Sequence, residues 1–199
     1  MMRACVLWIF YLFVCLSTSS MVCADMQEIE WKDVSSGIRG TDLHSLAVDP
    51  GNPDTVYASS YKTVYKTKDG GQTWTEVLSF RGTENGINTI AIDPLNSQVI
   101  YAGAAKGLYR SNDQGLYRER IFKGVGELEN AIFAVTVNPT KSENIYIGTI
   151  AGIFFTEDAG NNWGKGQNLP SEIIVVSIST DAYNPQILYA ASDRGIYKS

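Results

Sequence analysis

The chain has 199 residues, of which 44% are hydrophobic and 19% are charged, and its 18 glycines suit a turn-rich β protein. Its 16 Lys and Arg residues stand against 21 Asp and Glu residues, which gives a net charge of -5. An acidic chain offers no general electrostatic attraction to a phosphate backbone, so the composition argues against a nucleic-acid partner. After residue 25, no segment approaches the run of about 18 apolar residues that a membrane-spanning helix needs.

The first 24 residues have the features of a secretory signal peptide. Arg3 supplies a positive start, residues 4–16 are almost entirely apolar, and Val-Cys-Ala at residues 22–24 fits the small-x-small cleavage pattern. An uncleaved anchor is the alternative, but the apolar run is short for a membrane span. Lipidation at Cys23 is a second alternative, and it is disfavoured by the bulky valine that precedes this cysteine. We therefore predict cleavage after Ala24 and a secreted or periplasmic protein without cysteine.

Four copies of one sequence pattern follow the signal. Their equivalent tyrosines lie 44, 45 and 43 residues apart, at Tyr57, Tyr101, Tyr146 and Tyr189. Within each copy, short β-branched and aromatic runs bounded by Gly, Pro, Asn and Asp predict antiparallel strands, and no helical period is present. In the first copy these strands are expected at residues 43–48, 55–59, 64–66 and 73–78. Four strands in about 40 to 45 residues make one blade of a β-propeller, which predicts blades at about residues 43–80, 87–123, 132–168 and 173–199.

The turn between the third and fourth strands carries the most specific motif, Ser/Thr-x-Asp-x-Gly-x-x-Trp. It is complete at residues 67–74 and 156–163, and at residues 111–118 Arg118 replaces the Trp. The Asp can accept N–H groups of its own turn, the Gly permits a positive φ, and the Trp can pack between blades. We therefore expect structural roles, not catalysis or metal binding, for Thr67, Asp69, Gly71, Trp74, Ser111, Asp113, Gly115, Thr156, Asp158, Gly160 and Trp163.

These turns resemble the Asp-box of BNR-repeat β-propellers, and the resemblance extends from about residue 30 to residue 199. The Asp-Pro and Tyr-Ala phrases of the repeats are similar to those of xyloglucanase-type glycoside hydrolases, and sortilin-type receptors share the motif. The resemblance implies an all-β propeller of four-stranded blades. It also implies that the motif turns lie on the outer rim, away from the channel where ligands bind.

The two ends of the repeat array leave the number of blades open. The fourth copy stops at residue 199, before its own fourth strand, whereas residues 28–34 resemble a lone fourth strand because Trp31 to Val34 matches Trp74 to Val77. A terminal strand often completes the last blade of a propeller. Residues 28–34 could therefore close a ring of four blades. We favour an incomplete propeller instead, because Asp-box propellers generally have six or more blades.

Catalysis is disfavoured by the residues that it would need. Xyloglucanase-type enzymes use an acid between the second and third strands of an early blade as one of two carboxylates. The matching residues 59–63 contain no acid, and Asp193 in the fourth copy is the one acid in such a loop. The arginine-containing element that accompanies sialidase Asp-boxes is missing, and a single histidine, His44, makes a Ser-His-Asp triad nearly untenable. We expect no catalytic residue and no cofactor.

The loops between the second and third strands, and those between blades, usually form the ligand face of a propeller. The candidate ligand-face residues in these loops are Tyr61, Lys62, Arg81, Lys106, Asp193 and Arg194. We expect an exported, non-catalytic scaffold that binds a protein or glycan partner through this face, as fold-level analogy indicates. Self-association through open blade edges is a further expectation. The alternative is a truncated or partner piece of a secreted glycoside hydrolase of xyloglucanase type.

Overall fold

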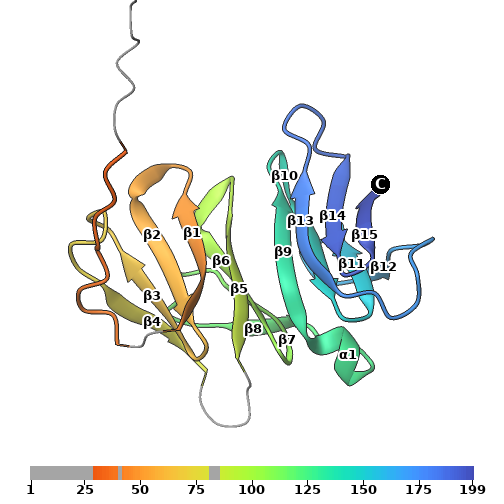
Figure 1. Ribbon diagram of the computed structural model, residues 1–199, viewed down its shortest axis with the longest axis horizontal. Coiled ribbons are helices and arrows are strands. Elements are labelled where there is room, and N and C mark those ends of the chain that lie inside the picture. The colour runs from red at the N-terminus through yellow and green to blue at the C-terminus, as the bar shows by residue number, and fades with distance from the viewer. Residues whose placement is uncertain (1–28, 40–41, 81–85) are drawn as a thin grey trace, which may run out of the picture. The chain divides into compact units, whose positions relative to one another are not determined.

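The computed structural model describes residues 29–39, 42–80 and 86–199, and nearly all of its regular structure is β (Figure 1). The predicted signal peptide lies outside the described residues. The chain divides into a unit of residues 1–33 and a unit of residues 34–199, and the fold described below is that of the second unit. Among the described residues, no helix has the length and apolar character needed to cross a membrane.

The second unit forms four antiparallel sheets in succession, each a meander in which neighbouring strands are consecutive in sequence (Figure 1). The first sheet contains β1 (Leu43–Asp49), β2 (Asn52–Ser60), β3 (Thr63–Thr67) and β4 (Thr75–Ser79). The second contains β5 (Ile87–Asp93), β6 (Asn96–Ala104), β7 (Gly107–Ser111) and β8 (Glu119–Phe122). The third contains β9 (Ile132–Asn138), β10 (Lys141–Thr149), β11 (Gly152–Thr156) and β12 (Gly164–Lys165). The fourth contains β13 (Val175–Thr180), β14 (Leu188–Ser192) and β15 (Gly195–Lys198).

The four sheets are the blades of the predicted all-β propeller, with three differences from the prediction. The fourth sheet has three strands in the described residues, in agreement with a fourth copy that stops before its fourth strand. The first difference is that β12 has two residues, because Gly164 and Gly166 weaken strand structure there. A short helix, α1 (Glu127–Asn130), was not predicted; the Glu129 carboxylate, which accepts the N–H of Val125 at 2.7 Å, holds it. Residues 29–34, predicted as a lone strand, belong to no strand in this structure.

Apolar clusters lie between neighbouring blades and explain the repeated tyrosines. Tyr57 on β2 packs in one cluster with Ile90 of the second blade, and Tyr101 on β6 packs in the next cluster with Ile145 of the third blade. The innermost strands of the four blades contact one another in chain order. Burial raises the pKa of both Tyr57 and Tyr101 to about 12, so both phenols remain neutral. Neighbouring blades therefore bury the apolar faces that they turn toward each other.

The aspartate that ends the first strand of a blade ties that blade to the next one. Asp49 accepts the N–H of Gly51 at 2.8 Å and the hydroxyl of Ser97 in the second blade at 2.5 Å. Asp93 likewise accepts the hydroxyl of Ser142 in the third blade at 2.6 Å. The repeated Asp-Pro phrase thus marks both a turn and a hydrogen bond between blades.

Candidate functional site

The three motif turns repeat one hydrogen-bond pattern. In the first, the Thr67 hydroxyl donates to Asp69 at 2.7 Å and accepts the N–H of Gly71 at 2.9 Å, while Asp69 also accepts the N–H of Thr73 at 2.9 Å. The equivalent bonds of the other two turns join Ser111, Asp113, Gly115 and Tyr117, and join Thr156, Asp158, Gly160 and Asn162. The aspartates are therefore engaged within their own turns.

The glycine of each motif turn is needed for its conformation and for close packing. Gly71, Gly115 and Gly160 have φ values of 93°, 99° and 95°, in the left-handed region that favours glycine. A Cβ at Gly71 would lie 2.8 Å from Cβ of Val34, and a Cβ at Gly115 would lie 2.9 Å from Cβ of Val77. Each turn is thus pressed against the chain segment that precedes its blade.

The last position of each motif turn reaches back to the same preceding segment. Nε1 of Trp74 donates to the carbonyl of Val34 at 2.7 Å, and Nε1 of Trp163 donates to the carbonyl of Ile121 at 3.0 Å. Arg118 in the second turn donates to the carbonyl of Ser79 at the end of β4 at 2.9 Å. Its guanidinium also lies 4.3 Å from the centroid of the Phe80 ring. The arginine thus supplies both the hydrogen bond and the apolar packing of the missing tryptophan.

Removing one buried hydroxyl from a motif turn should destabilise the protein. Thr67→Val keeps the shape of the side chain, which is 1% exposed, but leaves the N–H of Gly71 without its acceptor. We expect a loss of about 1 to 3 kcal/mol in the free energy of unfolding, measured by urea denaturation. Thr75→Val in the same blade is the control, with an expected change within about 0.5 kcal/mol, because Thr75 is exposed and water can replace its hydroxyl bond to the carbonyl of Lys66. An equal effect of both changes would contradict this role of Thr67.

A different set of turns gathers where blades are joined, and we call it the loop face. It contains the turns between the second and third strands of each blade and the connections between blades. The N–H of Phe80 donates to the carbonyl of Lys62 at 2.8 Å. The N–H of Asp193 donates to the carbonyl of Ile174 at 3.1 Å, and the Asp193 carboxylate accepts the N–H of Ile174 at 2.9 Å. These bonds fix the two kinds of loop beside each other.

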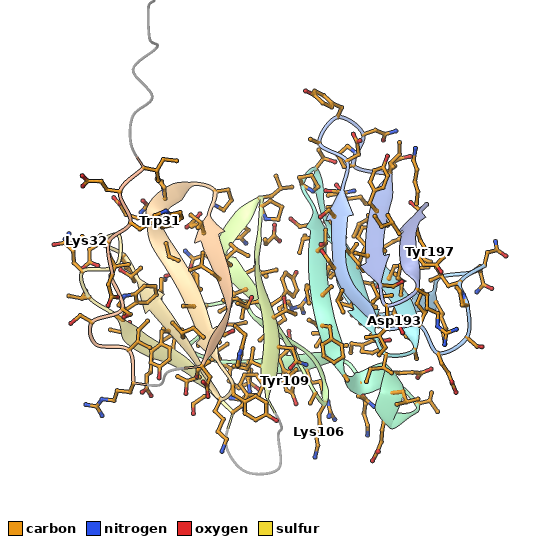
Figure 2. All side chains as sticks on the ribbon, viewed as in Figure 1. Trp31, Lys32, Lys106, Tyr109, Asp193 and Tyr197 are labelled. Atoms are coloured by element: carbon orange, nitrogen blue, oxygen red, sulfur yellow. The ribbon has the colours of Figure 1, made fainter. Side chains whose placement is uncertain are left out.

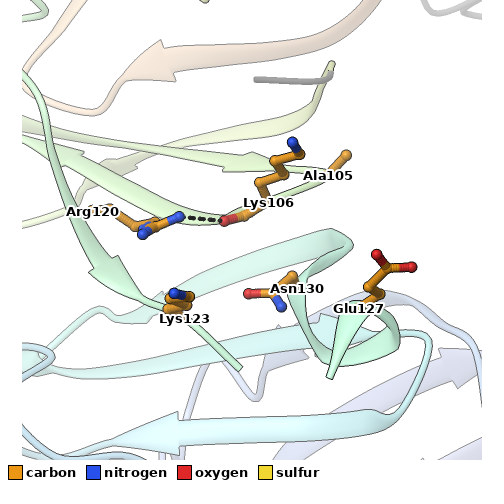
Figure 3. Close-up of a pocket in the computed structure, with 6 residues that line it drawn as sticks. All are labelled: Ala105, Lys106, Arg120, Lys123, Glu127 and Asn130. Atoms are coloured by element: carbon orange, nitrogen blue, oxygen red, sulfur yellow. Dashed lines mark hydrogen bonds between the residues drawn. The ribbon is translucent and has the colours of Figure 1, made fainter. Parts of the chain in front are cut away.

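The strongest candidate site on the loop face is a cavity of about 320 Å³, which we call the basic pocket (Figure 3). It is lined by Ala105, Lys106, Arg120, Lys123, Glu127 and Asn130. The guanidinium of Arg120 donates to the backbone carbonyl of Lys106 at 3.4 Å, which holds the Arg120 side chain against the turn at Lys106. None of the three cations forms a salt bridge with a described residue. Three cations and one carboxylate line this pocket, which makes it positive within an acidic protein.

A second cavity, of about 330 Å³, is also lined by α1 and has a different character. Its apolar lining includes Leu128, Ile150, Leu169 and Pro170. Lys165 also lines it and pairs with a carboxylate of α1 at 3.9 Å. Since Glu127 and Leu128 are consecutive in α1, a helix of four residues separates a positive pocket from an apolar one.

The predicted ligand-face residues do not form one site. Tyr61 and Lys62 lie at the turn between β2 and β3, and Arg194 lies at the turn between β14 and β15. Lys106 lies at the turn between β6 and β7, and Asp193 lies beside Arg194 (Figure 2). Arg81 lies outside the described residues. Of the five that are described, Lys106 lines the basic pocket, whereas the ring of Tyr61 contacts His44 with centroids 6.4 Å apart. Lys106 and Asp193 therefore belong to separate blades.

Three polar lining residues of the basic pocket were missed by the sequence reasoning: Arg120, Lys123 and Asn130. Arg120 lies on β8, and its side chain reaches the turn at Lys106. The signal in the sequence was the basic spacing from Arg118 through Arg120 to Lys123. Because Glu127 and Glu129 follow this cluster, a count of net charge along the segment does not reveal it.

Comparisons with known proteins agree with the fold. No family model and no curated protein matches the chain. Among solved structures, it is similar to a GH74 enzyme from Niastella koreensis, with 25% identity and a TM-score of 0.65 over 78% of this chain and 28% of that one. It is also similar to the GH74 xyloglucanase from Xanthomonas campestris, with 18% identity and a TM-score of 0.65 over 78% of this chain and 29% of that one.

A third similar structure is the extracellular domain of a proposed one component system from B. thetaiotaomicron. It is 20% identical, with a TM-score of 0.66, over 85% of this chain and 22% of that one. The chain thus spans less than a third of the length of each of these three proteins. Together with the four meander sheets, the likeness shows that this chain has the fold of a β-propeller.

Proposed function

We propose that this protein is an exported, non-catalytic β-propeller scaffold of the Asp-box type, which binds a protein or glycan partner through its loop face. The observation that supports the proposal most is the basic pocket, which Lys106, Arg120 and Lys123 line. Export is supported by the signal sequence of residues 1–24. The motif turns support the Asp-box assignment, because their hydrogen bonds are equivalent in three blades.

The charges of the basic pocket indicate what its partner carries. Neighbouring cations repel one another, so a pocket with Lys106, Arg120 and Lys123 but one carboxylate gains from an anion. A guanidinium and two ammonium groups suit a carboxylate, sulfate or phosphate group, because charge-assisted hydrogen bonds to such groups are short and strong. The net charge of -5 makes this attraction local to the pocket and not general.

The apolar cavity on α1 extends this interpretation. A partner whose acidic group enters the basic pocket can place a neighbouring apolar surface against Leu128 and Leu169. Acidic polysaccharides and acidic protein segments both offer such a combination. Carbohydrate rings have apolar faces, and protein segments carry apolar side chains. The loop face therefore supports binding of an acidic partner better than binding of a neutral one.

Reversing two charges of the basic pocket should abolish most of this binding. Arg120→Glu combined with Lys123→Glu is expected to weaken binding of polygalacturonate, or of a poly-glutamate peptide, by at least about tenfold for each lost charge-assisted contact. Isothermal titration calorimetry measures the change at fixed salt, since such contacts are screened. The matched control is Lys68→Glu combined with Lys141→Glu, which reverses two exposed cations away from the pocket and should change affinity little.

The result can also point elsewhere. Equal weakening by both double variants would mean that only overall charge matters, against a role for the pocket. Hydrolysis of xyloglucan by the purified chain, lost in Asp193→Asn, would contradict a non-catalytic scaffold. It would favour the alternative of a piece of a glycoside hydrolase, which the similarity to GH74 structures supports. Against that alternative, Asp193 already accepts the N–H of Ile174 at 2.9 Å.

A further inference from the structure

The outer face of the first blade exposes apolar residues whose equivalents are buried elsewhere in the repeat. Leu46 on β1 is 64% exposed, whereas the equivalent Ile90 and Ile178 are 8% and 6% exposed. The difference arises because a preceding blade covers Ile90 and Ile178, and no described blade precedes β1. Val48, which is 49% exposed, extends the same surface. We call this surface the leading face.

The last blade exposes the opposite half of the same interface, which we call the trailing face. Ile196 on β15 is 78% exposed, whereas the equivalent Val64 and Leu108 are fully buried by the following blade. Tyr189 is 40% exposed, whereas the equivalent Tyr57 is 1% exposed. Within the chain, such trailing residues always pack against leading residues of the next blade, as Tyr57 and Val64 do in the cluster that contains Ile90.

Val34 supplies an independent observation about what lies before the first blade. It packs against Gly71 of the first blade in the way that Val77 of β4 packs against Gly115, and Ile121 of β8 packs against Gly160. Its carbonyl also accepts the Trp74 side chain, as the carbonyl of Ile121 accepts the side chain of Trp163. Val34 thus takes the position of a fourth strand of a blade that precedes β1.

The fourth blade lacks this same strand in the described residues. Its outermost strand, β15, is paired with β14 and with no other described strand. An unpaired strand edge is a template for another chain. The sequence that leads into Val34 matches the fourth strand of the first blade, since Trp31 to Val34 aligns with Trp74 to Val77. The described residues of one copy therefore include both an unpaired edge at β15 and a segment that suits it.

We infer that two copies of this chain associate head to tail, with the leading face of each copy packed on the trailing face of the other. In this arrangement Leu46 and Val48 of one copy cover Ile196 and Tyr189 of its partner, and the segment before Val34 pairs with β15 of that partner. Two copies of the four described blades give eight, which is within the range of about 4 to 8 blades that propellers use. A heterologous contact of this kind forms a ring when its rotation closes.

One feature of the internal interfaces is missing from the proposed contact. Within the chain, Asp49 and Asp93 accept the hydroxyls of Ser97 and Ser142 in the next blade. At the proposed contact, Asp181 would meet the position of Pro53, whose side chain has no hydrogen-bond donor. We therefore expect dissociation in the micromolar range, weaker than the packing between blades of one chain.

Sedimentation velocity of two single variants and of their mixture tests this arrangement. The purified exported chain is expected to sediment as a pair at tens of micromolar. Leu46→Asp destroys the leading face and Ile196→Asp destroys the trailing face, so each variant alone should sediment as a single chain. Both sites are exposed, and unchanged thermal unfolding checks that the variants fold. An equimolar mixture should regain the pair, because the intact trailing face of the first variant meets the intact leading face of the second.

The mixture separates the arrangement from its alternatives. A symmetric pair in which identical faces meet would be disrupted by one variant and not by the other, and mixing would restore nothing. A single chain at every concentration for the unmodified protein would overturn the inference, and another occupant would then cover both faces. Leu116→Asp, at a site 82% exposed on a motif turn, is the matched control and should leave the pair intact.

Discussion

Leu108→Ala is expected to lower the free energy of unfolding by about 2 to 5 kcal/mol, the range for truncating a buried leucine. Leu108 on β7 is fully buried in the cluster between the second and third blades, where Ile145 and Phe122 also lie. The shorter side chain leaves a cavity that two sheets can fill only partly, because each sheet is held by its own ladder of hydrogen bonds. Urea denaturation followed by circular dichroism measures the loss.

The matched control for this change is Leu116→Ala. The chemical change is the same, but Leu116 is 82% exposed on a motif turn, so the expected effect is within about 0.5 kcal/mol. Similar effects at the two sites would mean that the second and third blades are not packed through Leu108. Because blades contact their neighbours in chain order, the loss of unfolding free energy should be detected by a spectroscopic probe in the second blade and by one in the third.

The strands and the order of the blades could be predicted because their signals are local. The first strand was expected at residues 43–48 and is observed at Leu43–Asp49, since alternation and the following Asp-Pro turn fix both ends. The turn motif likewise predicts its own hydrogen bonds, because Thr67, Asp69 and Gly71 lie within five residues. Because these local strand and turn signals recur in the four copies, the fold can be predicted from one sequence.

The lone strand could not be predicted from residues 28–34 alone. A strand exists when a partner offers a ladder, and sequence similarity to residues 74–77 identifies a suitable segment without supplying that partner. The observed contacts of Val34 show that this similarity reflects packing: Val34 lies against Gly71 and accepts a hydrogen bond from the Trp74 side chain of the first blade. The packing of Val34 is therefore present in the structure, but its segment forms no ladder of strand hydrogen bonds among the described residues.

The basic pocket could not be predicted because its walls come from different loops and depend on register. The pairing of β7 with β8 shifts by one residue between Leu108 and Tyr109 of β7. Tyr109 therefore lies opposite Arg120, while Leu108 lies opposite Phe122. A shift of one residue changes the face to which each following side chain points. The bulge therefore decides that Arg120 reaches Lys106, and no local pattern announces it.

Acid is expected to destabilise the blades through the motif turns. Hydrogen bonds from Thr73, and from Asn162 in the third blade, lower the pKa of Asp69 and of Asp158 from 3.8 to about 2. A carboxylate whose pKa is lower in the folded state stabilises the fold above its unfolded pKa. This contribution is lost as the pH falls from about 4 through about 2, where the folded carboxylates also become protonated.

The double variant Asp69→Asn and Asp158→Asn should remove that pH dependence. The amides do not titrate, so the urea midpoint of the variant should fall less between pH 4 and pH 2 than that of the unmodified protein, while at neutral pH the variant is the less stable of the two. Glu76→Gln combined with Glu157→Gln is the control, because neither exposed carboxylate accepts a hydrogen bond from a described residue. Equal flattening of the acid response in both double variants would assign it to overall charge. A steeper response in the Asn variant would contradict the lowered pKa of the two aspartates, and with it the account of the motif turns as carboxylate-held structures.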